Sequence, residues 1–379
     1  MLLYPSQIEL RDLARDFVRR EIAPFAADWD KRRHTPIDVL QRLGELGFFG
    51  VCVPERWGGA GADFVSYVLI MEEIAFGDAG VANMIAATNS PYCAAVNGFG
   101  TDAQKEKWLR PAASGRMGGA ILLTEPHAGS DAAAIKTAAR KRGDRYVING
   151  TKCFITSGRS AELAMVLAVT DPYAGKRGIS CFLTRTDAPG YVVTREEDKL
   201  GHRSNDTCEI SLENLDITAE DLLGNEGDGL RIALASLDNG RIGVAAQSVG
   251  VAQAALDAAV TYARERQTFG KPIMEHQAVS FMLAEMATKV EVARQMYLHA
   301  ATMKDAGISC IKEASMAKLY AAQMAEEVTS AAIQIHGGYG YIESYPVAKF
   351  WRDCRVFQIY DGTNEVQKLL IARELAAGR

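Results

Sequence analysis

The chain has 379 residues, which is too long for one compact core and favours two or three domains. Apolar residues make up 48% of the sequence and charged residues 23%, as in an ordinary globular protein. The formal net charge of −5 excludes a basic field that could hold nucleic acid or an anionic membrane.

No apolar stretch approaches the roughly 20 residues that a bilayer requires, and the N-terminus lacks the basic lead and apolar core of a secretory signal. The seven cysteines are scattered without a Cys-x-x-Cys pair, and the six histidines show no metal-ligand spacing. These patterns favour reduced thiols over a disulfide framework or a metal site. We therefore expect a cytoplasmic protein of bacterial type, with neither a membrane nor a nucleic acid as its partner.

Residues 1–117 show the periodicity of helices. Ser6 followed by Glu9 predicts a capping box ahead of the first apolar run. Further helices are expected over residues 37–46, 64–76 and 101–109. The sequence thus predicts an all-helical N-terminal domain.

Residues 118–226 change to a period of two, with turn signals such as Asn149-Gly150 and Pro189-Gly190 between short β-rich runs. Strands are expected over residues 121–123, 146–148, 163–169, 179–183, 191–193 and 207–212. This density of strands predicts a small barrel or sandwich.

Residues 227–379 return to long amphipathic helices. These helices are expected over residues 230–265, 275–306, 309–336 and 364–377. Four such helices with short links predict an antiparallel four-helix bundle. The fold class is therefore mainly α with a central β-domain.

Three stretches carry a resemblance to a known family. The first is Leu-Thr-Glu-Pro-His-Ala-Gly-Ser-Asp at residues 123–131, and the second covers the Arg-Glu-Arg-Gln-Thr-Phe-Gly-Lys run at 264–271. The third begins with Gln-Ile-His-Gly-Gly-Tyr at residue 334 and continues through Tyr-Asp-Gly-Thr-Asn-Glu at 360–365. In order and spacing these stretches resemble the acyl-CoA dehydrogenase family. The resemblance implies a helical domain, a β-domain and a four-helix bundle, assembled as a homotetramer (a dimer of dimers).

The family introduces an α,β double bond into an acyl-CoA thioester and passes electrons from FAD to an electron-transfer flavoprotein. This reaction needs a base, a stabilised thioester oxygen and a hydride acceptor. No Gly-x-Gly-x-x-Gly turn indicates a nicotinamide site. An oxygen-using flavin oxidase on the same fold, or a non-catalytic relative that binds CoA or FAD, stays open as an alternative.

The resemblance also implies which residues contact FAD. Threonines suit the edge of a flat flavin ring and an aromatic side chain can stack on it. Taken alone, each would be an ordinary strand or core residue, but within the motif the flavin contact is favoured. Paired glycines let backbone amides face a phosphate, and the segment after residue 264 reaches the cofactor of a neighbouring subunit. The implied positions are Leu123, Thr124, Gly129, Ser130, Phe154, Ile155, Thr156, Arg266, Thr268, Phe269, Gln277, Gln334, Gly337, Gly338, Thr363 and Glu365.

Substrate contacts are implied for Ser130, Asp238, Arg241 and Gly362. A helix-capping carboxylate and a structural ion pair are the competing interpretation of Asp238 and Arg241. His127 replaces a small residue of the family motif, and its role is undecided.

The sequence departs from the family at the catalytic base, where Asp361 stands in place of the usual Glu. Some relatives carry a base one helix earlier, just before the arginine that corresponds to Arg241, but that position is Gly240. An Asp draws the carboxylate back by about 1 Å, and a misplacement of that size can cost about a hundredfold in rate. Three explanations are open: a bulkier or cyclic acyl group, slower oxidation of a conventional substrate, or loss of the base function. A related group of flavin nitroalkane oxidases also uses Asp, without the Gly-Thr-Asn-Glu continuation found here.

Overall fold

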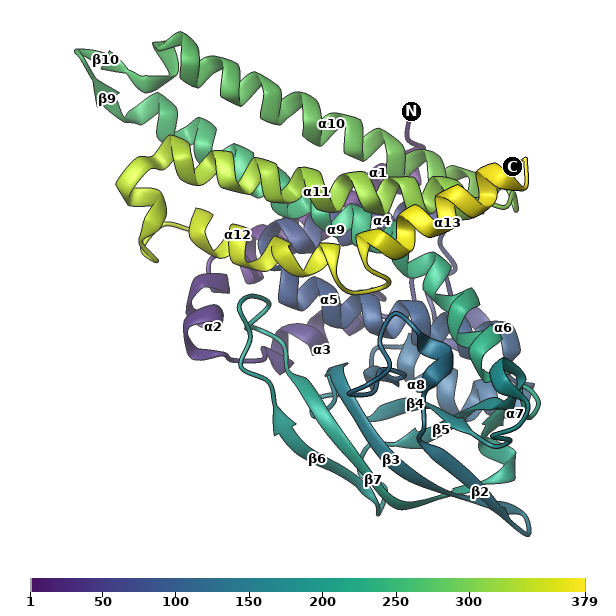
Figure 1. The fold of residues 1–379 in the computed structure, drawn as a ribbon. Helices are drawn as coiled ribbons and strands as arrows, with labels where there is room; N and C mark the ends of the chain where they lie inside the picture. Colours follow the sequence, from purple (N-terminus) through teal and green to yellow (C-terminus); the bar gives the residue numbers. More distant parts are fainter. Residues whose placement is uncertain (1, 379) are drawn as a thin grey trace.

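The computed structural model describes residues 2–378, except the side chain of Asp238. Figure 1 shows long C-terminal helices at the top, a twisted β-sheet at the bottom, and N-terminal helices between and behind them. Within the described residues no helix combines the length and the apolarity needed to cross a bilayer. The arrangement confirms a mainly α fold with a central β-domain.

The N-terminal region is helical, as expected. It contains α1 (Pro5–Glu21), α2 (Ala26–Arg32), α3 (Ile37–Glu45), α4 (Phe64–Gly77), α5 (Ala79–Ala87), α6 (Ala94–Phe99), α7 (Asp102–Gln104) and α8 (Arg110–Ala113). The helix expected over 101–109 begins with Thr101 as its cap and continues through a wider π turn (Lys105–Leu109) into α8.

The expected capping box at Ser6 and Glu9 is wrong. Helix α1 begins at Pro5, and the backbone N–H of Tyr4 donates a hydrogen bond to Gln7 Oε1 at 2.9 Å. Proline favours the first helical position because its fixed φ suits the helix and its missing N–H would have no partner there. The helix therefore starts before Ser6, which lies inside its first turn.

The central region forms one mixed sheet. Its strands are β1 (Gly119–Leu122), β2 (Ala138–Arg142), β3 (Arg145–Thr156), β4 (Leu163–Val169), β5 (Ile179–Arg185), β6 (Tyr191–Glu196), β7 (Thr207–Thr218) and β8 (Leu222–Leu223). Their order is β6–β7–β3–β2–β4–β5–β8, and β1 pairs with β4 in parallel. Tyr146 of β3 meets Phe182 of β5 in one core, with ring centroids 4.9 Å apart, so the sheet folds over on itself. Strand β2 was not expected, because three of its five residues are basic and hide the alternation.

The C-terminal region contains the expected bundle. Its helices are α9 (Gly229–Glu265), α10 (Gln277–Asp305), α11 (Ile311–His336) and α13 (Asn364–Ala376), with the shorter α12 (Val347–Cys354) before the last. A two-stranded hairpin, β9 (Gln267–Thr268) and β10 (Lys271–Pro272), joins α9 to α10 and projects from one end of the bundle (Figure 1). Helix α11 packs against α9, α10 and α13.

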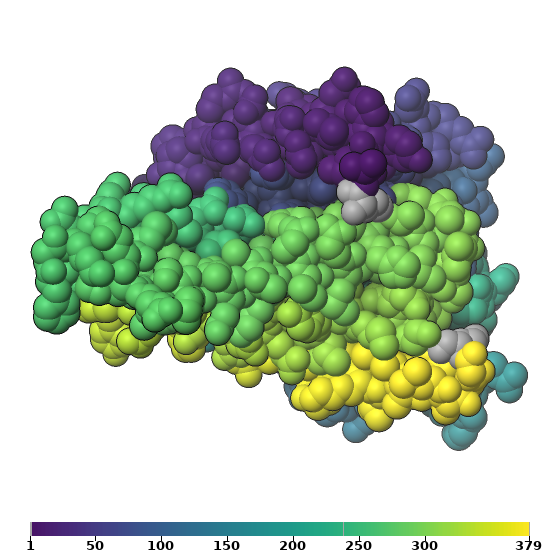
Figure 2. Space-filling view, turned by 90° about the horizontal axis from the view of Figure 1, so that it is seen from above, coloured from purple at the N-terminus to yellow at the C-terminus, as the bar shows by residue number. Residues whose placement is uncertain are grey.

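The N-terminal and C-terminal helices share one hydrophobic core. Helix α4 is buried on almost every side and packs along α9, so its apolar residues continue the core of the bundle. Figure 2 shows the N-terminal helices in purple lying along the green C-terminal helices. A helix that is apolar all round needs such enclosure. The two helical regions are therefore a single packing unit.

A buried ionic cluster ties all three regions together. Lys349 of α12 lies 2.9 Å from Asp78, the residue that caps α5, and 2.6 Å from Asp353. The other oxygen of Asp353 accepts a hydrogen bond from the backbone N–H of His202 at 2.7 Å, and Ser204 bonds Asp78. His202 and Ser204 belong to the loop between β6 and β7. A buried charge must be paired to be tolerated, so this cluster fixes the sheet relative to α12.

We predict that Lys349→Met strongly destabilises the fold, because Asp78 and Asp353 would stay buried without their cation. Breaking a buried pair in this way costs about 3–5 kcal/mol. The control is Arg145→Met, which removes an exposed pair with Asp216 (2.7 Å) worth at most about 1 kcal/mol. Thermal unfolding of the two variants measures the difference. Equal shifts of Tm would contradict the role given to Lys349.

Candidate active site

Asp361 lies in a tight turn just before α13. Both Asp361 and Gly362 have positive φ angles, 53° and 85°, which is a rare conformation for a residue with a side chain. The turn is held from inside the protein. Gln367 donates hydrogen bonds to the carbonyl oxygens of Asp361 (3.3 Å) and Gly362 (2.9 Å), and Lys318 Nζ donates to that of Gly362 at 2.9 Å.

These bonds set the direction of the neighbouring amides. In a planar trans peptide the N–H points opposite to the C=O. Since Gln367 takes the carbonyl of Asp361, the N–H of Gly362 points away from Gln367. This hydrogen bond therefore fixes the plane of the Asp361–Gly362 peptide, directly after the N–H of Asp361.

The carboxyl of Asp361 has opposing influences on its pKa. Removal from water by the surrounding protein raises this pKa, and the positive charges of Lys318 and Arg241 act to lower it. Asp361 is nevertheless only half-buried, so part of its surface faces open space. Arg241 is buried on α9, and Lys318 is completely buried on α11. The result is a poorly solvated carboxyl, still accessible, with a raised pKa.

Gly240 makes room for this carboxyl. A methyl group built on Gly240 of α9 would lie 2.9 Å from Asp361 Oδ2, closer than real contacts allow. The carboxylate of Asp361 therefore leans into space that any other residue at position 240 would occupy. Gly240 sits directly before Arg241, so one turn of α9 supplies both the space and a charge.

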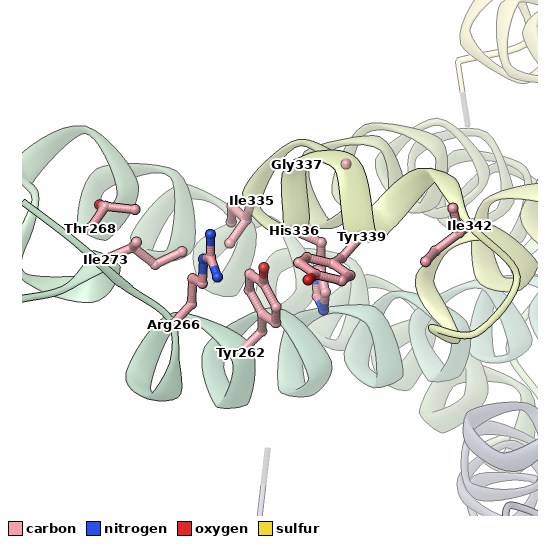
Figure 3. Close-up of a pocket in the computed structure, with 10 residues that line it drawn as sticks. Tyr262, Arg266, Thr268, Ile273, Ile335, His336, Gly337, Tyr339 and Ile342 are labelled. Carbon is pink, nitrogen blue, oxygen red and sulfur yellow. The ribbon is translucent and has the colours of Figure 1, made fainter.

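A second group of expected residues lies at the end of the bundle. Arg266, Thr268, Gly337 and Gly338 line a pocket with a volume of about 430 Å³. Its other lining residues were not expected from the sequence: Tyr262, Ile273, Ile335, His336, Tyr339 and Ile342. Figure 3 shows the ring of Tyr262 between Arg266 on one side and His336 and Tyr339 on the other.

Aromatic rings shape this pocket. Tyr262 stacks on His336 with ring centroids 4.3 Å apart, and the Arg266 guanidinium lies 5.9 Å from the centroid of Tyr339. Burial lowers the pKa of His336, which keeps the ring neutral. A methyl group on Gly337 or Gly338 would meet nothing within 4 Å, so backbone here is open to a ligand. Beside the pocket, Phe269 is 97% exposed, and Gln277 and Gln334 are exposed as well.

A third group lies on the sheet. Phe154 sits at a bulge of β3, with a φ angle of 57°, and its ring is 66% exposed. A bulge turns a side chain out of the regular alternation. Thr156 at the end of β3 accepts a hydrogen bond from Asn83 at 3.3 Å, and Thr124 is half-buried after β1. Ile155 points into the sheet core, so only its backbone is available to a ligand.

The remaining expected residues have mixed surroundings. Gly129 and Ser130 are exposed, and a methyl group on Gly129 would meet nothing within 4 Å. The carbonyl of Leu123 accepts a hydrogen bond from the buried Lys152 at 3.1 Å. The Thr363 side chain caps α13 by accepting from the Val366 N–H at 3.3 Å.

Three other positions named from the sequence lie outside these groups. Glu365 is exposed in the first turn of α13, which lowers its pKa through backbone hydrogen bonding. His127 is exposed, 3.2 Å from the Ala134 carbonyl. The side chain of Asp238 lies outside the described part of the structure.

Sequence reasoning missed the groups that hold Asp361 in place. Lys318 could have been noticed as a lysine in an alanine-rich, apolar stripe of α11. Gln367 carries no such signal, because polar residues of this kind are common on helix surfaces. Asn83, which donates to Thr156 rather than to the Asp361 turn, was missed for the same reason. The residues expected to contact the cofactor thus form two separate groups within one chain: one lies on the β-domain, and the other lies around Arg266 at the hairpin end of the bundle (Figure 1).

The residues present fit FAD. An exposed aromatic ring at Phe154, two residues before the hydroxyl of Thr156, suits a flat ring system, because aromatic rings stack on one another in offset or tilted arrangements. A cationic side chain at Arg266 beside open glycine backbone at residues 337–338 suits a phosphate group.

Comparisons with known proteins agree with this fit. Family models for the N-terminal, middle and C-terminal domains of acyl-CoA dehydrogenases match residues 5–116, 120–215 and 227–376. The chain is 45% identical over 373 residues to an acyl-CoA dehydrogenase of Bacillus subtilis (strain 168), covering 98% of each protein. It superposes on butyryl-CoA dehydrogenase of Megasphaera elsdenii with a TM-score of 0.98 and 42% identity, covering 99% of each chain.

A chain in a structure of the electron transferring flavoprotein of Acidaminococcus fermentans gives the same TM-score, 0.98, with 43% identity and 99% coverage of each chain. The fold and its sites thus define an FAD-dependent oxidoreductase that acts on acyl-CoA. The chain belongs to the acyl-CoA dehydrogenase family.

We predict that Gly240→Ala slows flavin reduction by an acyl-CoA substrate, because the new methyl group displaces the Asp361 carboxylate. The contact of 2.9 Å is relieved by a shift well under 1 Å, so the loss of rate should stay below the roughly hundredfold cost of a full 1 Å displacement. Gly98→Ala is the matched control: Gly98 is also helical, and a methyl group there meets nothing within 4 Å. Anaerobic stopped-flow absorbance measures both rates. Unchanged reduction in Gly240→Ala would show that the carboxylate does not depend on this space.

Proposed function

We propose that the protein oxidises an acyl-CoA to its α,β-unsaturated thioester with Asp361 as the base. When bound, FAD supplies the acceptor for the β-hydride. The Asp361 carboxylate removes the α-proton, whose acidity is low enough that the base must lie close and be poorly solvated. The observation that carries the proposal is the half-buried Asp361 carboxyl, with a raised pKa and beside two cations.

The turn that carries Asp361 also offers donors for the thioester oxygen. The N–H of Asp361 would contribute a hydrogen bond as negative charge develops there, as oxyanion donors do in acyl chemistry. Gly362 has no side chain to block the approach of a thioester to this backbone. Ser130, Arg241 and Asp238 are proposed contacts of the CoA portion.

FAD would be held by two groups of residues from different subunits. Phe154 and Thr156 with the Thr124 region would contact the ring system, and Gly129–Ser130 the adjoining part. Residues at the hairpin end of the bundle would reach the cofactor of a neighbouring copy: Arg266, Thr268, Phe269, Gln277, Gln334, Gly337 and Gly338. The separation of the two groups within one chain supports this sharing (Figure 1). Such sharing requires at least two copies, and the family resemblance extends the proposal to a homotetramer built as a dimer of dimers.

The proposed electron acceptor is an electron-transfer flavoprotein. Its support is the close similarity to a chain in a structure of the electron transferring flavoprotein of Acidaminococcus fermentans. The acceptor would be another protein, so the chain itself needs no nicotinamide site.

The proposed acyl group is bulky at the α-carbon, branched or alicyclic like cyclohexanecarboxyl. Asp361 is one methylene shorter than Glu, and its carboxylate leans toward α9 into the space left by Gly240. Both features leave more room in front of the carboxylate. An α-substituted or cyclic acyl group would use that room and bring its α-carbon within reach of the shorter base.

We predict that Asp361→Asn keeps FAD and CoA-ester binding and loses flavin reduction by at least about a hundredfold, the lower range for losing a general base. The amide has nearly the shape of the carboxylate but does not accept the α-proton as a carboxylate does. Anaerobic bleaching of the flavin absorbance measures the rate. Reduction of Asp361→Asn at the wild-type rate would mean that another group is the base.

Asp361→Glu tests the acyl group within the same experiment. Cyclohexanecarboxyl-CoA and isobutyryl-CoA should become poorer substrates relative to butyryl-CoA, because the longer side chain fills the room beside the α-carbon. The ratio of the kcat/KM values is the measurement. A uniform gain for all three thioesters would contradict a bulky acyl group and leave the base assignment standing.

A further inference from the structure

Lys318 is a completely buried cation in the middle of the bundle. It projects from α11 at a position flanked by buried residues on the same face: Ala314, Ser315, Ala317, Ala321 and Ala322. Lysine is almost never fully buried without a partner, because leaving water costs free energy for the charged form. The same effect lowers the pKa of Lys318 to about 8. The burial of Lys318 is therefore expected to be offset by specific contacts.

The contacts of Lys318 converge on the turn that carries Asp361. Its Nζ donates to the carbonyl oxygen of Gly362 at 2.9 Å and to Asn364 Oδ1 at 3.4 Å. Both partners are neutral. The negative charge that most favours the protonated lysine is the Asp361 carboxylate. Lys318 thus binds the backbone next to Asp361 and faces its charge.

Other charged or titratable groups also face this site. Arg241 on α9 is a second cation beside Asp361, and Glu365 at the start of α13 is an anion that favours charged Lys318. Tyr67 on α4 is buried and Tyr360 next to Asp361 is half-buried, and the pKa values of both phenols are raised, chiefly by removal from water. These phenols are neutral at physiological pH, so Lys318 and Arg241 supply the positive charge.

We propose that Lys318 is a positioning residue for the reaction, which holds the turn through Gly362 and keeps Asp361 ionised by its charge. This inference rests on the proposed role of Asp361 as the base. The hydrogen bond fixes the strained turn, in which two successive residues have positive φ. The charge offsets the burial that would otherwise leave the carboxyl protonated and unable to accept the α-proton.

The sign of the pH effect follows. Burial raises the pKa of Asp361, and Lys318 lowers it. Without Lys318 the pKa of Asp361 rises further, so a higher pH is needed to ionise the base. The acidic limb of the pH profile of flavin reduction must then move to higher pH, by about one unit for the loss of one nearby opposite charge. Below that limb, one unit corresponds to about a tenfold loss of rate.

The experiment separates the hydrogen bond from the charge. Lys318→Met removes both and keeps the length of the side chain, whereas Lys318→Gln keeps a neutral donor for Gly362. Lys289→Met is the control, since Lys289 pairs with Glu327 on the surface of the same bundle at 2.7 Å. Each variant is prepared with its FAD, and single-turnover reduction by butyryl-CoA and isobutyryl-CoA is followed from pH 5 to pH 9.

We expect the acidic limb to move to higher pH in both Lys318 variants and to stay in place in Lys289→Met. Lys318→Met should in addition lose rate on the plateau, because its turn is no longer held. Unmoved limbs in both Lys318 variants would overturn the inference. So would a Lys318→Gln variant that cannot retain FAD, since the lysine would then serve the fold alone. The Asp361→Asn variant distinguishes this failure from the failure of the proposed function, which its own activity reveals.

Discussion

The site depends on a balance at one carboxyl group: burial opposes the charge of Asp361, and the cations of Lys318 and Arg241 favour it. Neither influence suffices alone. A fully solvated carboxylate is a weak base toward the α-proton of a thioester, and a buried carboxyl without cations stays protonated. The architecture supplies both by placing one turn between α9 and α11. The alanine-rich packing of these helices is what allows a lysine to lie completely buried against the turn.

Contacts in the rest of the fold hold the Asp361 turn in place relative to the helices and the sheet. Helix α4 and the bundle share one core, so the N-terminal helices cannot move independently of α9. The Lys349 cluster anchors the loop between β6 and β7 to α12, which ends seven residues before Asp361 in the chain. His202 of that loop packs edge-on against Tyr360, with ring centroids 6.1 Å apart. The sheet that presents Phe154 is thereby linked physically to the turn that presents Asp361.

Periodicity in the sequence was enough to find the long elements. The bundle helices and strand β4 appear where their apolar repeats place them, because burial on a fixed face enforces the repeat. Prediction from capping motifs and from alternation failed at two places, where other residues determined the local structure. Pro5 moved the start of α1, and the basic residues of β2 obscured its alternation. The motif identified Asp361, but Gly240, Gln367 and Lys318 come together only in three dimensions. The linear sequence does not show which of these residues lie close to Asp361 in the folded protein.

The substitution of Glu by Asp acquires a physical meaning only beside Gly240. The shorter side chain does not leave a simple gap, since its carboxylate leans toward α9 and uses the space that the glycine leaves. The position of the Asp361 carboxylate thus depends on the absence of a side chain at Gly240.

The most direct test of the central claim is exchange of the α-hydrogens with solvent deuterium, measured on a thioester that cannot donate a hydride. (Methylthio)acetyl-CoA has the length of butyryl-CoA but carries sulfur at the β-position, so proton removal is isolated from flavin reduction. Proton NMR in D₂O follows the exchange with the FAD-loaded protein and with Asp361→Asn. Our account predicts rapid exchange with the first and only the background rate with the second. Exchange at the same rate with both proteins would contradict it.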